Sequence, residues 1–103
     1  GDGTSVGWGT ALGKDSSVGD GSQIGSNVSI ANGAVIGSNV TIGNGTTIAK
    51  NVQISDGAVI GTNVVISSGA TIGAGAQIGN GATIKANATV PPGAVIPAGA
   101  IYP

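Results

Sequence analysis

An aliphatic residue recurs at every sixth position of this 103-residue chain, without a single insertion or deletion. The series begins at Val6 and has its one leucine at Leu12, while Tyr102 takes the seventeenth position in place of an aliphatic residue. All the remaining members are isoleucine or valine. A fixed short period along a whole chain is typical of repeat proteins, in which each unit packs on its neighbours. This repeat constrains the fold more than any other feature of the sequence.

Two further positions of each six-residue unit are restricted. The residue two places before the aliphatic one is small or β-branched throughout, as at Val40 and Ala58. The residue before that is always Gly, Asn or Asp, the types that best tolerate a left-handed backbone. Eleven of the 21 glycines stand there. The other ten, counting Gly1, occupy the place in the repeat that comes directly after the aliphatic position. Each unit therefore predicts a short strand followed by a type II turn, such as Gly43-Asn44-Gly45.

Alternating strands and turns predict a solenoid. A period of six does not match the 3.6-residue turn of a helix, and a glycine in each unit would cost a helix about 1 kcal/mol. Successive coils are expected to stack with parallel strands about 4.8 Å apart, which places isoleucine above isoleucine inside. The whole chain, residues 1–103, is predicted to form one all-β domain.

The pattern Ile-Gly-x-Asn/Gly-Ala/Val-x, as in residues Ile36 to Thr41, resembles the hexapeptide-repeat family. The resemblance covers the whole chain and implies a single-stranded left-handed parallel β-helix, with three hexads in each triangular coil. Seventeen hexads then make about 5.7 coils, with a height of about 27 Å at the strand spacing. The left-handedness is implied by the resemblance alone, because the general rule for parallel crossovers predicts the right-handed form.

The composition excludes several functional classes. The chain contains no Cys and no His, which removes disulfides, thiol nucleophiles, the usual general base and the commonest metal ligands. Three lysines cannot supply the basic stripe that nucleic-acid binding requires, and no apolar run approaches a membrane span. We therefore expect no catalytic residue, no metal site, no cofactor, and neither nucleic acid nor membrane as a partner.

The best-known relatives in this family are acyltransferases that use acyl-CoA or acyl-carrier protein, form trimers and commonly rely on a catalytic His. The segment Thr89 to Ile96 is similar to the Val-Pro-Pro-x-x-Val stretch that ends many of the acetyltransferases. Lys85 precedes it and is the one weak candidate for a cofactor contact, to the CoA phosphates. The catalytic His and the substrate loop of those enzymes are missing. Pro91, Pro92 and Pro97 are interpreted as stiffening the final coil and discouraging further strand pairing.

The remaining candidates are interpreted as structural. The aspartates occupy turn positions, so we expect solvated corners rather than a carboxylate pair, with Asp15 and Asp20 at different corners. Trp8 is either a surface residue or a lid, and Trp8 and Tyr102 are both expected to cap the two ends of the solenoid in part.

We expect a non-catalytic structural or assembly module that associates with itself, by end-to-end stacking into filaments or as a trimer. The alternatives are the solenoid portion of a hexapeptide-repeat acyltransferase with its catalytic residues elsewhere, and an engineered or idealised β-helix.

Overall fold

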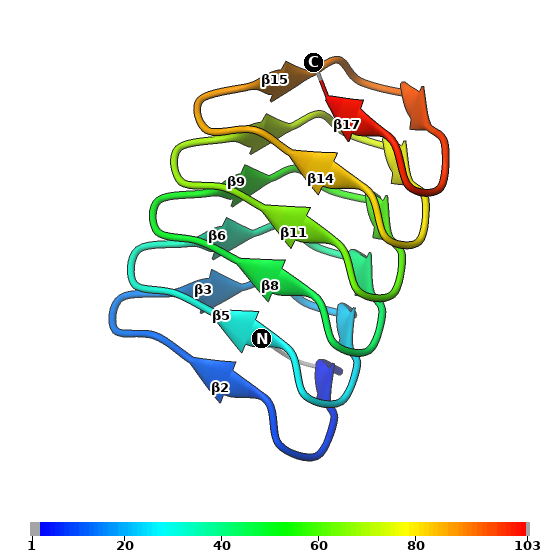
Figure 1. Ribbon diagram of the computed structural model, residues 1–103. Helices are drawn as coiled ribbons and strands as arrows, with labels where there is room; N and C mark the ends of the chain where they lie inside the picture. Colours follow the sequence, from blue (N-terminus) through cyan, green and yellow to red (C-terminus); the bar gives the residue numbers. More distant parts are fainter. Residues whose placement is uncertain (1–2, 103) are drawn as a thin grey trace.

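The computed structural model describes residues 3–102, which wind into a three-sided parallel solenoid of just over five turns (Figure 1). This confirms the predicted all-β fold and the triangular coil of three hexads. Each hexad contributes one strand of two residues. The strands are β1 (Ser5–Val6), β2 (Ala11–Leu12), β3 (Ser17–Val18), β4 (Gln23–Ile24), β5 (Ser29–Ile30), β6 (Val35–Ile36), β7 (Thr41–Ile42), β8 (Thr47–Ile48), β9 (Gln53–Ile54), β10 (Val59–Ile60), β11 (Val65–Ile66), β12 (Thr71–Ile72), β13 (Gln77–Ile78), β14 (Thr83–Ile84), β15 (Thr89–Val90), β16 (Val95–Ile96) and β17 (Ile101–Tyr102). Residues 3–102 contain no helix that could cross a membrane. The left-handed sense of winding stays a prediction from the family resemblance.

The strands form three parallel sheets, one on each side of the prism. The first sheet has the order β1-β4-β7-β10-β13-β16, the second β2-β5-β8-β11-β14-β17, and the third β3-β6-β9-β12-β15. Paired residues are eighteen apart, so that Ile42 lies beside Ile60 and Ile60 beside Ile78. The described chain measures 31 Å along its longest axis and about 21 and 20 Å across. Equivalent side chains therefore stack in columns parallel to the long axis.

The turns have the predicted backbone. The third turn residue has a positive φ in every hexad, 75° at Gly45 and 59° at Asn39 for example. Glycine is needed directly after a strand for a different reason, which is the close approach of the next coil. A Cβ added to Gly43 would lie 2.7 Å from the backbone of Gly61 and Thr62. The two glycine positions of the hexad thus serve different needs, one of conformation and one of space.

The core consists of the aliphatic column and the small residues beside it. The aliphatic residues are buried from Ile24 to Ile96, and the small position is buried from Ser22 to Ala88. Val6 and Leu12 are 47% and 49% exposed, because they belong to the first described coil and pack against a coil on one side only.

The two aromatic residues behave differently. Tyr102 is partly buried and packs against the core, which confirms its predicted role as a partial end cap. The same prediction for Trp8 is wrong. Trp8 is 91% exposed, because the turn between β1 and β2 directs its side chain outward rather than over the open end.

Most turns are closed by their own backbone, as in the bond from the Ala58 N–H to the Ser55 carbonyl at 3.4 Å. Three turns are closed instead by a hydroxyl from the preceding coil, and their last residues are Val28, Val40 and Val64. The hydroxyls belong to Thr10, Ser22 and Thr46, each of which also donates to the carbonyl of the first residue of the same turn.

Candidate functional site

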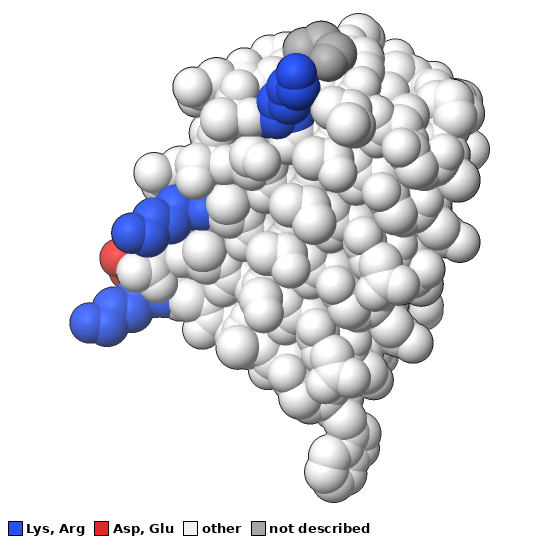
Figure 2. All heavy atoms as spheres, in the orientation of Figure 1, with Lys and Arg blue, Asp and Glu red and all other residues white. Residues whose placement is uncertain are grey.

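The three lysines of the chain lie on one edge of the prism. Lys14 follows β2, Lys50 follows β8 and Lys85 follows β14, and these strands all belong to the second sheet. Each lysine is exposed, and Figure 2 shows lysines spaced along one side of the molecule. Neighbouring lysines are about two coils apart, which corresponds to about 10 Å at the strand spacing. We call these three residues the lysine edge.

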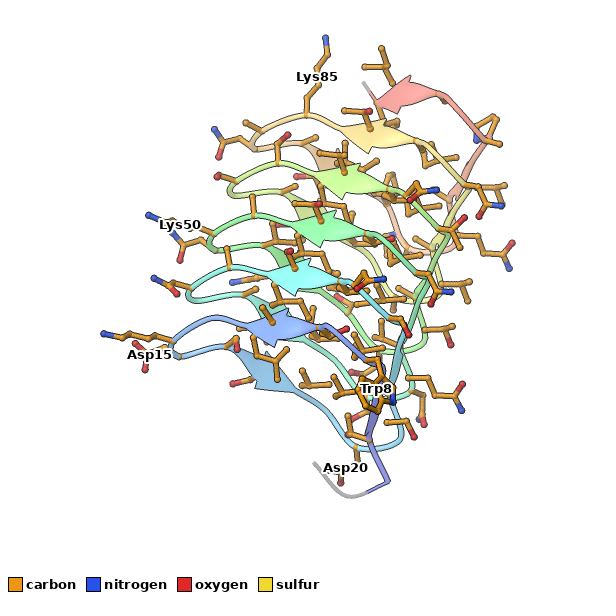
Figure 3. All side chains as sticks on the ribbon, turned by 60° about the horizontal axis from the view of Figure 1, so that its bottom comes forward. Trp8, Asp15, Asp20, Lys50 and Lys85 are labelled. Atoms are coloured by element: carbon orange, nitrogen blue, oxygen red, sulfur yellow. The ribbon has the colours of Figure 1, made fainter. Side chains whose placement is uncertain are left out.

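Two aspartates lie on the next edge along the chain. Asp20 follows β3 and Asp56 follows β9, both strands of the third sheet. We call this pair the aspartate edge. Asp15 is separate, because it shares a turn with Lys14, and Figure 3 shows it apart from Asp20. The predicted placement of Asp15 and Asp20 at different corners is therefore confirmed, whereas Asp2 lies outside the described residues.

The Asp56 carboxylate takes part in the structure of its corner. Its Oδ1 accepts a hydrogen bond from the Ser38 backbone N–H in the preceding coil, at 2.8 Å. Asparagines accept the same kind of hydrogen bond between coils elsewhere: Asn32 from Lys14, Asn44 from Ser26, and Asn80 from Thr62, at 2.8–2.9 Å. Because neutral asparagines accept the same bond at equivalent positions, the hydrogen bond to Asp56 does not require its negative charge.

A hollow of about 370 Å³ lies beside the aspartate edge. Its lining comes from the third sheet and the adjoining corners: Val35, Gly37, Gln53, Ile54, Ser55, Asp56 and Ala74. Asp56 is its only ionisable residue, and that carboxylate already accepts the bond from Ser38. The hollow therefore offers no pair of ionisable groups for acid–base exchange.

The candidate cofactor residue Lys85 and the proline-containing segment are not brought together. Lys85 lies at the corner between β14 and β15, whereas Pro91 and Pro92 lie at the following corner, between β15 and β16. The Lys85 side chain points away from the body of the solenoid in Figure 3, and its backbone N–H donates to the Tyr102 carbonyl at 2.8 Å. A contact between Lys85 and CoA stays a prediction.

Catalytic and metal-ligating groups are sparse in this chain. Its sequence contains neither His nor Cys. Among residues 3–102, no three side chains of His, Cys, Asp or Glu gather as metal ligands would. The candidate site therefore consists of two charged edges on either side of the third sheet and the hollow beside one of them.

The repeat matches a known family model in two overlapping segments. Residues 15–50 and 39–74 both match the model described as bacterial transferase hexapeptide (six repeats), and together they cover more than half of the chain. The chain belongs to the bacterial transferase hexapeptide family.

Solved structures share the fold of this hexapeptide-repeat chain. The acetyltransferase domain of PglB from Neisseria gonorrhoeae has a TM-score of 0.87 at 23% identity, with 89% of this chain and 45% of that one covered. A mutant of perosamine N-acetyltransferase from Caulobacter crescentus, in complex with CoA and GDP-perosamine, has a TM-score of 0.90 at 19% identity, covering 94% and 48%. A hexapeptide-repeat acetyltransferase from Vibrio cholerae, in complex with acetyl coenzyme A, has a TM-score of 0.50 at 19% identity, covering 93% and 66%.

The chain spans slightly less than half the length of the first two of these proteins. At such low identity the similarity shows a shared fold. A comparison with curated protein sequences finds no significant match.

Proposed function

We propose that this chain is the solenoid part of an acyltransferase, a scaffold that supplies surface and spacing but not the catalytic base. The observation that supports the proposal is the similarity to two acetyltransferase structures, with TM-scores of 0.87 and 0.90 over about half of their length. Transfer of an acyl group needs a base for the attacking amine or hydroxyl. The chain has no His, so in this proposal the base comes from outside residues 1–103.

The polar groups of the chain are consistent with a scaffold. The Asp56 carboxylate accepts a hydrogen bond from the Ser38 backbone N–H at its own corner, and no second ionisable residue lines the hollow beside it. The buried hydroxyls of Ser22 and Thr46 bond to turn backbone, which leaves them unavailable as nucleophiles. The exposed lysines are about 10 Å apart at the strand spacing, too far to act together on one reacting atom.

The charged edges support lateral association with further copies. Lys14 and Asp20 are six residues apart, as are Lys50 and Asp56, and they lie on opposite borders of the third sheet. Six residues are a third of a coil, so each pair differs in height by only about 1.6 Å. In parallel copies placed side by side, Lys14 and Lys50 of one copy are therefore at nearly the same height as Asp20 and Asp56 of the next. Exposed ion pairs contribute about 0–1 kcal/mol each, so we assign them a role in register rather than in overall affinity.

The second candidate function is a purely structural module. It is supported by the unbroken register of the described residues, in which every hexad forms the same strand and turn and no loop leaves the solenoid. Under this proposal the faces carry no ligand site, and self-association is the whole function.

Titration with acetyl-CoA distinguishes the two. We expect the ¹⁵N-labelled chain to show shifts confined to one corner or face at millimolar acetyl-CoA, without release of free CoA thiol. An absence of shifts at every concentration would contradict the acyltransferase scaffold and leave the structural module. Thiol release above the buffer rate would contradict the absence of catalytic groups.

A further inference from the structure

The amides that directly follow the strands all donate in the same direction between coils. The residue that follows each strand donates its N–H to the next coil, as Gly73 does to Val90, Gly79 to Ile96 and Lys85 to Tyr102, all at 2.8 Å. This bond is present at every such position from Gly7 to Lys85. Amides at this position therefore always point toward the C-terminal end of the solenoid.

Two other kinds of amide point the same way, one of them only in some hexads. The first residue of a strand donates to the next coil, as Gln77 does to Ala94 at 2.8 Å. The second turn residue does so where a suitable side chain follows, as Thr62 does to Asn80 Oδ1 at 2.9 Å. The C-terminal end of any coil thus presents these N–H donors to the next coil. It also presents carbonyls of second turn residues, which accept from the next coil, as Asn80 does from the Gly99 N–H at 2.9 Å.

In the last described coil, prolines take three of these donor positions. Pro91 directly follows β15, Pro97 directly follows β16, and Pro92 is the second turn residue after Pro91. Every proline in the chain lies at or beyond Pro91, so no earlier coil contains one. Proline has no amide hydrogen, and its Cδ occupies the direction in which the hydrogen would point.

We infer that Pro91, Pro92 and Pro97 close the C-terminal end of the solenoid against the addition of another coil. The coil that they exclude is the first coil of a second copy. In a stack that continues the winding, Pro91 would face the carbonyl of the next copy's Val6, and Pro97 would face that of its Leu12. Each ring would then place a carbon against an oxygen that a neighbouring coil elsewhere binds through an N–H.

This inference bears on how copies associate. Edge strands with unpaired donors and acceptors are templates for further strands unless something blocks them, and proline on an edge is one such block. Filaments formed by end-to-end stacking stay an untested prediction of the sequence, and the prolines argue that the unaltered chain does not form them. Association through the sides of the prism is left unaffected, because the three rings lie at the end. The inference rests on the backbone bonds alone and does not depend on the proposed acyltransferase role.

The test compares the unaltered chain with the triple variant Pro91→Gly, Pro92→Ala and Pro97→Gly. These replacements are the residues that the chain itself has one coil earlier, at Gly73, Ala74 and Gly79. Sedimentation velocity from micromolar to millimolar concentration is expected to show that the mass of the unaltered chain reaches a limit and does not keep rising with concentration. The mass of the triple variant is expected to rise several-fold with concentration, and filaments one assembly wide are expected in electron micrographs. Val95→Thr with Ala98→Ser alters the same coil, keeps the prolines and is expected to match the unaltered chain.

Amide hydrogen exchange provides a second measurement that needs no variant. In the unaltered chain, the amides of Thr89, Val95 and Ile101 are expected to exchange fast at all concentrations, at least about tenfold faster than those one coil earlier. Protection of these three amides at millimolar concentration, or filaments of the unaltered chain, would overturn the inference. A triple variant that is folded by circular dichroism and keeps the mass of the unaltered chain would overturn it equally.

Discussion

The hydroxyl of Ser22 bridges a turn that belongs to the next coil. Its Oγ accepts a hydrogen bond from the Val40 backbone N–H at 3.1 Å and donates to the Gly37 carbonyl at 2.8 Å. Gly37 and Val40 are the first and last residues of one turn, whose own backbone bond the hydroxyl replaces. A buried serine in this core is therefore fully satisfied, and it ties two coils together.

Thr46 and Thr47 provide a matched test of this bridge. Thr46 is buried and bonds to Gly61 and Val64, whereas the adjacent Thr47 is exposed on the second sheet. Thr46→Val is expected to lower the free energy of unfolding by about 1–3 kcal/mol, since it leaves turn groups of the next coil without their partner. Thr47→Val is expected to stay within about 0.5 kcal/mol. Urea denaturation measures both, and equal midpoints would contradict the bridge.

The aliphatic column is expected to dominate stability. Ile54 is 2% exposed, whereas its neighbour Gln53 faces outward. Ile54→Ala should cost about 2–5 kcal/mol, because it removes buried surface and leaves a cavity. Gln53→Ala should change stability by no more than about 0.5 kcal/mol. Comparable denaturation midpoints for the two variants would refute the assignment of inward and outward positions.

Gly57 tests the conformation of the turn separately from its packing. Its φ is 76°, and a Cβ added there would meet nothing closer than the Gly75 nitrogen at 3.9 Å. The cost of a side chain is therefore almost entirely backbone strain. Gly57→Val is expected to cost about 1–3 kcal/mol. Gly57→Asn is expected to be mild, because Asn39 and Asn63 hold the same turn position at φ values of 59° and 56°. Thermal unfolding compares the stability of the two variants. Equal losses of stability would contradict a positive φ at this turn position.

Lateral association through the charged edges is expected to depend on salt and on Asp56. Asp56→Asn removes the charge but keeps an oxygen that can accept the Ser38 N–H, as Asn44 does for Ser26. We expect unchanged stability, together with association that is weaker by up to about fivefold per pair lost, as exposed ion pairs allow. Lys50→Glu should weaken association further by placing like charges opposite each other. Sedimentation equilibrium at low and high salt checks this, and salt-independent association of the unaltered chain would exclude the edges as the contact.

A role of Lys85 in acetyl-CoA binding is tested by comparison with Lys14, which lies at the other end of the lysine edge. Lys85→Ala is expected to weaken acetyl-CoA binding several-fold, because removal of the lysine takes away a charge-assisted contact to phosphate. Lys14→Ala is the control, since Lys14 occupies the same edge in the first described coil. Chemical-shift titration measures both affinities. Equal effects of the two substitutions would indicate general charge attraction instead of a site at Lys85.

Much of the fold follows from the sequence because the period is strict. The six-residue spacing of the isoleucines, and the restriction of the third turn position to Gly, Asn and Asp, were enough to predict strands, turns and an inward column. Whether Trp8 covers the end of the solenoid could not be predicted in this way. Its turn position allows either a lid or an outward side chain, and the structure has it 91% exposed.

The sequence by itself determined which positions turn, which face inward and which chemistry is absent, because these depend on the residues within one hexad. Only the tertiary structure decided what lies against what across coils, because those contacts join residues 15 to 19 positions apart. It showed that the Ser22 hydroxyl closes the turn at Val40. It also showed that the three lysines lie at one border of the third sheet, while Asp20 and Asp56 lie at the other. It also showed that the amide after each strand points toward the C-terminal end, where Pro91 and Pro97 remove it. That direction arises from how each parallel strand pairs with a different neighbour on either side, which no single hexad specifies.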